Sequence, residues 1–280
     1  MRLDRAATLY VFHPLARRSS GGRDKQVSIL MYHSISNENE DKVHPYYQVT
    51  TTPGRFEEQM ELLREEGYVV LPLAEVARAV EAAEPPKQNC VAITFDDGYH
   101  DFLSFALPVL RKYSFPATVF LPTAFIGDTP QVFKNKPCLT WSDVRELHKA
   151  GVAFGSHTVS HPQLHDVSPS ELEREVRESK TAIEDHLSCA VDSFSYPYAF
   201  PEQDAEFKRR LRNLMEESGY RHGVSTIIGT LGPKDDRLFL KRLPVNSLDD
   251  SRFFRAKLEG GYNWVHAFQY ATKLIKSKAV

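Results

Sequence analysis

The sequence predicts an α/β fold in which a parallel β-sheet is covered by helices. Stretches typical of strands and of helices alternate along most of the 280 residues, which indicates a parallel sheet with helices outside. About seven strands are expected, enough for the sheet to close into a barrel or to stay open. Polar side chains follow several strands directly, where the active site of a (β/α) barrel lies: His33, Asp96, Asp97, His157, His161 and Tyr198.

In the first half of the chain, short apolar runs rich in β-branched residues predict strands at 27–32, 69–71, 90–95 and 117–121. Apolar residues at helical spacing predict helices at 55–66, 73–83 and 101–113. Gly67 ends the first of these helices, and two prolines at 85–86 end the second. Residues 1–26 carry scattered arginines and a Ser-Ser-Gly-Gly break, which predicts a loose N-terminal arm. Residues 34–54 are polar and contain two prolines, so we expect a long loop.

In the second half, the same reasoning predicts strands at 152–155, 192–196, 223–227 and 239–245. Helices are expected at 141–150, 168–187, 202–219, 252–258 and 264–276. The best-marked helix starts with Ser-Pro-Ser-Glu at 168–171, which supplies a cap, a first-turn proline and a first-turn acid. Residues 27–280 are therefore predicted to form a single domain that ends in helices.

Composition and charge exclude several classes of protein. With a formal net charge of −2, the chain does not have the excess of basic residues that is typical of a nucleic-acid-binding protein. No apolar stretch approaches the roughly twenty residues of a membrane span, and the N-terminal apolar run is too short for a signal peptide. The spacing of Cys90, Cys138 and Cys189 fits neither a disulfide framework nor a metal knuckle, so we expect reduced thiols and a cytoplasmic location.

The adjacent carboxylates of Asp96 and Asp97 are the first candidate for chemistry. Neighbouring side chains on a strand point to opposite faces, but at a strand end before Gly98 the chain can turn both into one pocket. One carboxylate could then bind a cation while the other acts as a base. The alternative is an ordinary acidic turn in which an aspartate caps the following helix.

His157 and His161 are the second candidate. Their spacing of four residues places both imidazoles on one face of a helical turn, an arrangement known in zinc sites. Such a spacing also arises by chance, and His161 and His165 form a second pair of the same kind. The sequence alone leaves open whether two or three of these histidines are ligands.

Together the segments TFDDGY at 94–99 and SHTVSH at 156–161 resemble the first two motifs of the polysaccharide deacetylase family, the NodB-homology group. A third motif of this carbohydrate esterase family 4-like group, a Pro-Tyr after a strand, is similar to Pro197-Tyr198. The resemblance covers about residues 27–246, and the opening LMYH at 30–33 is similar to the branch of exopolysaccharide N-deacetylases. It implies a distorted (β/α) barrel and a metal-dependent hydrolase that removes N-acetyl groups from N-acetylhexosamine units.

The resemblance also implies roles for particular residues. Asp97, His157 and His161 would bind the metal, above all Zn²⁺, with Co²⁺, Ni²⁺ or Mn²⁺ as alternatives. Asp96 would be the general base that accepts a proton from the attacking water. The backbone N–H of Tyr198 would stabilise the oxyanion. His165 would then lie outside the ligand set.

Two features depart from the family pattern. Many members have an arginine before the Pro-Tyr motif that pairs with the base, and the Leu-x-His that carries the general acid is not evident here. Arg242 could supply the missing charge, with a surface salt bridge as the alternative. His33 is the candidate acid because it follows the first strand, and a structural histidine is the alternative. Tyr99, Pro197 and Tyr198 are expected to contact the sugar.

We therefore expect a carbohydrate N-deacetylase acting on an N-acetylated sugar polymer, oligosaccharide or glycan precursor. Two alternatives remain open from the sequence. Some relatives open cyclic imides or ureides on the same fold, and residues 34–54 could form a lid for such a small substrate. The missing family residues also allow a non-catalytic relative that keeps the metal and binds glycan, although an intact Asp96 argues against it.

Overall fold

The computed structural model describes residues 2–19, 25–38, 40, 42–45, 47–83, 87–233, 235–268 and 270. Its strands are β1 (Val27–Tyr32), β2 (Ser34–Ile35), β3 (Thr50–Thr51), β4 (Val69–Val70), β5 (Cys90–Phe95), β6 (Thr118–Leu121), β7 (Val132–Phe133), β8 (Lys136–Pro137), β9 (Ala153–Ser156), β10 (Ser193–Ser195), β11 (His222–Ile228) and β12 (Leu240–Pro244). The described cysteines 90, 138 and 189 are free thiols.

The main sheet closes on itself. Within the described chain, seven strands follow one another in the order β1-β12-β11-β10-β9-β6-β5, and β5 pairs with β1 to complete the ring. All neighbouring pairs in the ring are parallel, as the strand–helix alternation predicted. The open-sheet alternative is therefore wrong, and the predicted (β/α) barrel of about seven parallel strands is confirmed.

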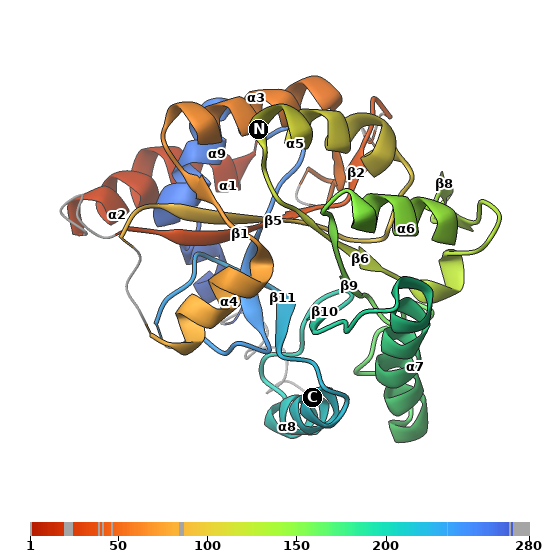
Figure 1. Cartoon of the computed structure of the whole chain (residues 1–280). Helices are drawn as coiled ribbons and strands as arrows, with labels where there is room; N and C mark the ends of the chain where they lie inside the picture. The colour runs from red at the N-terminus through yellow and green to blue at the C-terminus, as the bar shows by residue number, and fades with distance from the viewer. Residues whose placement is uncertain are drawn as a thin grey trace.

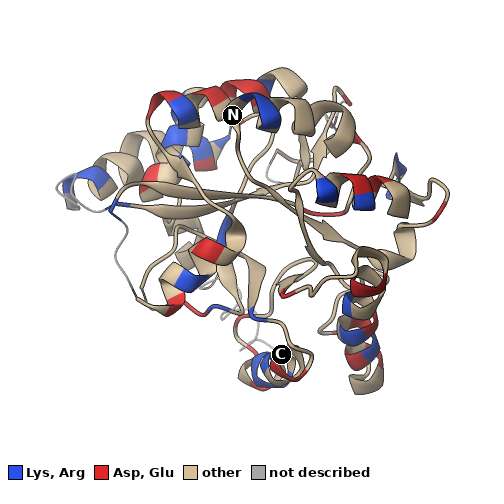
Figure 2. Cartoon of the chain, in the orientation of Figure 1, with Lys and Arg blue, Asp and Glu red and all other residues tan. Residues whose placement is uncertain are grey.

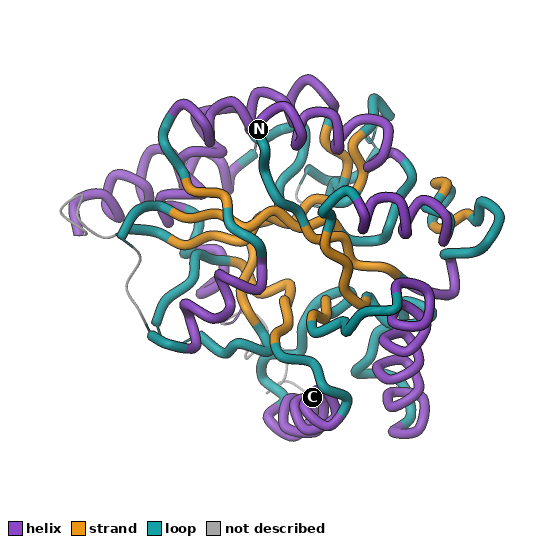
Figure 3. Tube along the Cα trace, in the orientation of Figure 1, coloured by secondary structure: helices purple, strands orange, loops and turns teal. Residues whose placement is uncertain are grey.

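Helices surround this ring and shield it from solvent (Figures 1 and 3). They are α1 (Leu3–Ala7), η1 (Thr8–Phe12), α2 (His13–Ser19), α3 (Pro53–Glu65), α4 (Leu73–Glu81), η2 (Phe102–Ala106), α5 (Leu107–Tyr113), η3 (Thr123–Phe125), α6 (Trp141–Lys149), α7 (Pro169–Leu187), α8 (Ala205–Glu217), α9 (Ser251–Ala256) and η4 (Lys257–Gly261). Charged residues gather on the outer helices, and the strands carry few of them (Figure 2). Among the described residues, no helix has both the length and the apolar character needed to cross a bilayer.

The N-terminal segment differs from the expectation of a loose arm. Residues 3–19 are helical in succession and pack against the end of the chain. The ring of Phe12 stacks on Trp264 at 4.7 Å, and the indole Nε1 of Trp264 donates to the hydroxyl of Thr8 at 3.0 Å. Arg2 pairs with the fully buried Asp249. The expectation was wrong because the partners that order this segment lie about 250 residues away in the sequence.

Two further segments correct the sequence prediction. The loop expected over 34–54 contains a short parallel pair, β2 and β3. A hairpin of β7 and β8, which the sequence analysis did not predict, turns through Lys134 and Asn135, both in the left-handed region. Of the predicted last helix, residues 264–268 and 270 are helical, and its remainder lies outside the described residues, as do the prolines at 85–86.

Candidate active site

The candidate site lies where the parallel strands of the barrel end. Strands β5 and β1 are in register over their last residues, so His33 and Asp96, which directly follow them, lie side by side. Strand β9 ends opposite the middle of β10, and this places His157 beside Ser195. Chain segments more than a hundred residues apart thus meet at one mouth, because the carboxyl ends of all strands in a parallel barrel share one face.

Asp96 is buried in a dense polar network. Arg242, on β12, donates from Nη1 to Oδ1 and from Nη2 to Oδ2 of Asp96, both at 2.8 Å. The hydroxyl of Ser195 donates to Oδ1 at 3.2 Å, and the guanidinium also reaches the carbonyl of Ser225. Burial raises the pKa of Asp96, but the charge and hydrogen bonds of Arg242 together with His157 and His33 outweigh it, and the pKa falls to about 2. Asp96 is therefore a carboxylate at neutral pH.

Arg242 is completely buried, so the alternative of a surface salt bridge is wrong. Its planar group matches the carboxylate in a two-point contact, which fixes both the position and the orientation of Asp96. Breaking such a buried pair leaves an uncompensated charge and costs roughly 3–5 kcal/mol. Arg242 therefore pairs with Asp96, the carboxylate with which the arginine before the Pro-Tyr motif was expected to pair.

Asp97, His157 and His161 form a buried group whose potential ligand atoms all lie within 4.8 Å of one another. Oδ1 of Asp97 is 3.5 Å from Nε2 of His157 and 3.3 Å from Nε2 of His161. The other carboxylate oxygen, Oδ2, accepts a hydrogen bond from the hydroxyl of Tyr99 at 2.9 Å. Two imidazole nitrogens and one carboxylate oxygen are the ligand set of many catalytic zinc sites.

The hydrogen bonds around this group fit a metal ion. Nδ1 of His157 lies 2.8 Å from the carbonyl oxygen of Ser195, which can only accept, so Nδ1 carries the proton and Nε2 keeps its lone pair. Oδ1 of Asp97 is buried and has no hydrogen-bond partner among the described residues. Burial lowers the pKa of His161 to about 4, which leaves its imidazole neutral and able to coordinate. Burial alone would raise the pKa of Asp97, but His157 and His161 hold it well below its ordinary value.

Four non-glycine residues at this mouth have left-handed backbone angles: Asp97 (φ 72°), Thr158 (φ 69°), His161 (φ 55°) and Tyr198 (φ 57°). Such conformations are uncommon outside glycine and persist only where the surroundings hold them. At Tyr198 the hydroxyl of Thr226 donates to the backbone carbonyl at 2.7 Å. The strained backbone is thus concentrated at the residues that form the site.

A buried glutamate holds the turn that carries the two histidines. Glu175 of α7 accepts hydrogen bonds from the backbone N–H groups of Val159 and Ser160, both at 2.8 Å. It also accepts from the hydroxyl of Ser160 at 2.8 Å. The sequence analysis missed Glu175, although a glutamate on the apolar stripe of a helix, next to Leu172 and Val176, is a visible signal.

The β7–β8 hairpin covers the group of Asp97, His157 and His161 from one side. The ring of Phe133 lies 5.1 Å from that of His161, between centroids. Nζ of Lys134 lies 3.4 Å from Oδ2 of Asp97 and above the ring of Tyr198. A lysine ammonium this close to Asp97 competes with any cation for the same carboxylate.

Replacing Lys134 with methionine is therefore expected to tighten zinc binding, by roughly three- to tenfold, since it removes a like charge next to Asp97. Competition with a chromophoric chelator measures the affinity without any need for activity. Lys136→Met is the matched control on the same hairpin, because Lys136 pairs with Glu38 instead. Equal affinity of the two variants would contradict this account of Lys134.

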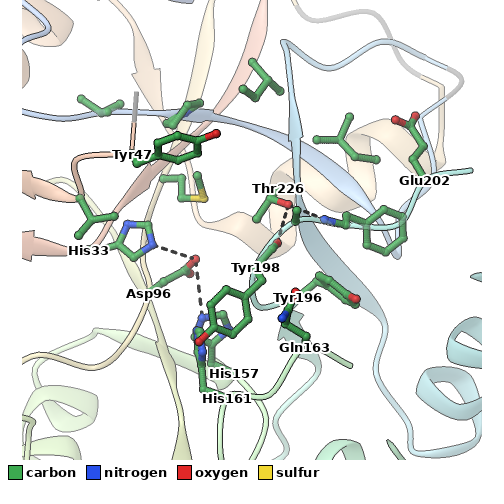
Figure 4. Close-up of a pocket in the computed structure, with 18 of the residues that line it drawn as sticks. His33, Tyr47, Asp96, His157, His161, Gln163, Tyr196, Tyr198, Glu202 and Thr226 are labelled. Carbon is green, nitrogen blue, oxygen red and sulfur yellow. Dashed lines mark hydrogen bonds and ion pairs between the residues drawn. The ribbon is translucent and has the colours of Figure 1, made fainter. Parts of the chain in front are cut away.

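A cavity of about 610 Å³ opens beside these residues, and its lining includes His33, Asp96, His157, His161 and Tyr198. Figure 4 shows His33 pointing toward Asp96, with His157 and His161 below them and Tyr198 beside them. Nε2 of His33 lies 4.0 Å from Oδ2 of Asp96. Burial lowers the pKa of His33, against the opposing charges of the two aspartates.

Not every predicted site residue lies in this cavity. The side chain of Tyr99 is buried and donates to Asp97, so it is not placed to stack on a sugar. Pro197 is also buried and is not part of the lining, and only Tyr198 of the predicted sugar-contact residues is. His165 is exposed and pairs with Asp166 and Asp204, away from the ligands. The ring of His266, assigned no role from the sequence, does line the cavity.

The chain is similar to several known proteins. The family model described as polysaccharide deacetylase matches residues 83–223. YxkH of Bacillus subtilis (strain 168), which is named as a polysaccharide deacetylase, is 30% identical over 234 residues, 84% of this chain and 76% of that protein. The poly-beta-1,6-N-acetyl-D-glucosamine N-deacetylase of Escherichia coli (strain K12) is 30% identical over 139 residues, 46% of this chain and only 20% of that protein.

The fold is similar to that of a solved deacetylase structure. The deacetylase PplD of Streptococcus pyogenes, solved in complex with acetate, superposes with a TM-score of 0.71 at 26% identity. The match covers 84% of this chain and 99% of that chain. The barrel predicted from the sequence is therefore the fold of a known deacetylase as well.

Proposed function

Because this chain belongs to the polysaccharide deacetylase family, we propose that it removes N-acetyl groups from N-acetylhexosamine units of a glycan or glycan precursor, with a divalent metal. The family and its class of enzyme, a hydrolase acting on carbon–nitrogen bonds, are as predicted. The substrate and the metal dependence are our proposal. One observation carries it: the buried, ionised Asp96 lies next to an unpartnered carboxylate oxygen of Asp97 that faces two imidazoles.

Each residue has a defined task in this proposal. A divalent cation held by Asp97, His157 and His161, above all Zn²⁺, would supply Lewis-acid chemistry to the water and to the acetyl carbonyl. Asp96 accepts a proton from the attacking water through Oδ2, which faces Nε2 of both His33 and His157 at 4.0 Å. Arg242 holds Asp96 ionised and correctly oriented. The backbone N–H of Tyr198 donates to the developing oxyanion.

His33 is the residue proposed to protonate the leaving amine. It lines the cavity next to the base and follows β1, the strand that neighbours β5, after which Asp96 stands. Histidine is the side chain most often used for this step. Among the described residues, and apart from the proposed ligands His157 and His161, no other histidine is found both in the cavity lining and paired with Asp96.

Replacing His33 with alanine is expected to lower kcat by roughly 10²–10⁴-fold and to change KM much less, since the lost interaction is made in the transition state. Steady-state kinetics of acetate release measure both constants. His165→Ala, on an exposed histidine, serves as the control. Unchanged kinetics in His33→Ala would clear this residue of the acid role.

Acetate release from a panel of N-acetylated oligosaccharides tests the proposed function directly. We expect release that stops on chelation and returns with Zn²⁺ or Co²⁺. Turnover of cyclic imides with none of sugars would favour the second candidate activity, and metal bound without turnover of either would favour a glycan-binding protein. The cytoplasmic location remains a prediction, which fractionation of cells can test.

A further inference from the structure

One arc of the barrel mouth differs in chemistry from the rest. In the ring, β1, β12 and β11 are consecutive, and β11 lies across from β5, after which Asp96 follows. This arc and the loops beside it line the cavity with apolar side chains: Met31, Val49, Ile227, Ile228, Pro244 and Val245. We call these six residues the apolar wall. In Figure 4 the polar residues His33, Asp96, His157 and His161 are grouped together, and Tyr47, Thr226 and Glu202 lie in the other part of the cavity.

Two polar side chains next to the apolar wall, those of Thr226 and Gln48, are already engaged. The hydroxyl of Thr226 donates to the carbonyl of Tyr198 at 2.7 Å and accepts from the backbone N–H of Phe200 at 2.9 Å. The amide nitrogen of Gln48 donates to two backbone carbonyls of its own loop. A sugar ring placed here would bury hydroxyl groups against carbon, and each unpaired hydroxyl costs about 1–3 kcal/mol.

The chain's last described segment forms part of the same enclosure. His266 and Tyr270 line the cavity, and His266 is held by an ion pair with Glu202 at 2.7 Å. Trp264, at the start of this segment, is anchored on the N-terminal helix through Phe12. The apolar wall is therefore part of a bounded cavity that is continuous with the catalytic residues, and a chain attached to the reacting sugar can reach it.

We propose that the apolar wall binds a hydrocarbon chain attached to the substrate sugar, so that the substrate is a lipid-linked N-acetylhexosamine. Displacing water from an apolar surface by a hydrocarbon chain is favourable in free energy. A second sugar would gain less there, because its hydroxyl groups would lose their water without finding partners. The inference rests on the proposed function for the sugar that reacts. It adds that the group attached to this sugar is an apolar aglycone, bound on the other side of the cavity, and not a longer glycan.

The affinity of the zinc-loaded wild-type protein for two glycosides tests this inference. Calorimetry with octyl and methyl N-acetyl-β-glucosaminide, each below its micelle concentration, is expected to show at least tenfold tighter binding of the octyl compound. Equal affinities overturn the proposal. Tighter binding of N-octanoylglucosamine but not of the octyl glycoside also overturns it, because the chain would then enter through the acyl group. Acetate release is measured in parallel, so that the two failures can be told apart: an alkyl preference without turnover counts against the proposed function, and turnover without an alkyl preference overturns this inference alone.

Variants locate the preference within the cavity. Ile227→Asp is expected to reduce the octyl-to-methyl affinity ratio to about one, since a charge on the wall repels hydrocarbon. Val49→Thr, which conserves the shape, should reduce the ratio partly and serves if the first variant does not fold. Val132→Asp, on an exposed side chain outside the cavity, should leave the ratio unchanged. A ratio that is the same in all three variants overturns the assignment to the wall.

Discussion

Replacing Asp96 with asparagine is expected to lower acetate release by roughly 10²–10⁴-fold while zinc still binds. An amide has nearly the shape of the carboxylate but cannot accept the proton of the attacking water. The ligand atoms of Asp97, His157 and His161 are not changed by the substitution. Acetate assays together with metal analysis of the purified variant check both halves of the expectation.

The same variant also leaves Arg242 buried without its counter-charge, so its free energy of unfolding should fall. Asp101→Asn is a suitable control, because Asp101 is a half-buried carboxylate that bonds to Ser34 and not to Arg242. Urea denaturation of both variants separates a catalytic effect from a folding effect. An Asp96→Asn enzyme that is folded and turns over at a near-normal rate would remove Asp96 from the role of base.

Replacing His157 with alanine is expected to abolish both zinc binding and acetate release. In the proposed site His157 would offer Nε2 to the metal, and its ring is oriented by the Nδ1 bond to the carbonyl of Ser195 at 2.8 Å. Loss of an outer hydrogen-bond partner typically costs 10–100-fold in metal affinity, and loss of a ligand should cost more. Equilibrium dialysis against ⁶⁵Zn²⁺ measures the affinity independently of any activity.

His165→Ala is the matched control for this second experiment. It removes a histidine that belongs to the same sequence pattern but points to Asp166 and Asp204 at the surface. Zinc affinity and acetate release should both stay at the wild-type level. If His165→Ala lost zinc as His157→Ala does, the ligand set assigned here would be wrong.

The sequence predicts those parts of the site that are contiguous in the chain. The two motifs at 94–99 and 156–161 place Asp96, Asp97, His157 and His161 because each motif directly follows a strand, and parallel strands end at one face. Arg242 could be proposed for the same reason. Lys134 could not, because its approach to the site depends on a hairpin that no local pattern encodes. Glu175 gave a signal as a glutamate on the apolar stripe of its helix, but the turn that it holds could not be read from that pattern.

Two expectations were wrong for different reasons, one local and one distant along the chain. Tyr99 follows Gly98, whose positive φ of 60° turns the chain, and the tyrosine hydroxyl ends under Asp97 instead of in the cavity. The N-terminal residues look unstructured in the sequence because of their scattered arginines and the Ser-Ser-Gly-Gly break at 19–22. Their order comes from Trp264, Asp249 and other residues near the opposite end of the sequence.

This pairing of the two ends of the chain has a consequence for synthesis. The helical residues 3–19 are made long before Trp264, the residue that Phe12 and Thr8 contact. Until then their apolar side chains lack this native partner, and the part of the cavity lining formed by His266 and Tyr270 is also incomplete. Folding of the nascent barrel therefore includes a late step in which residues 3–19 dock onto the segment that contains Trp264.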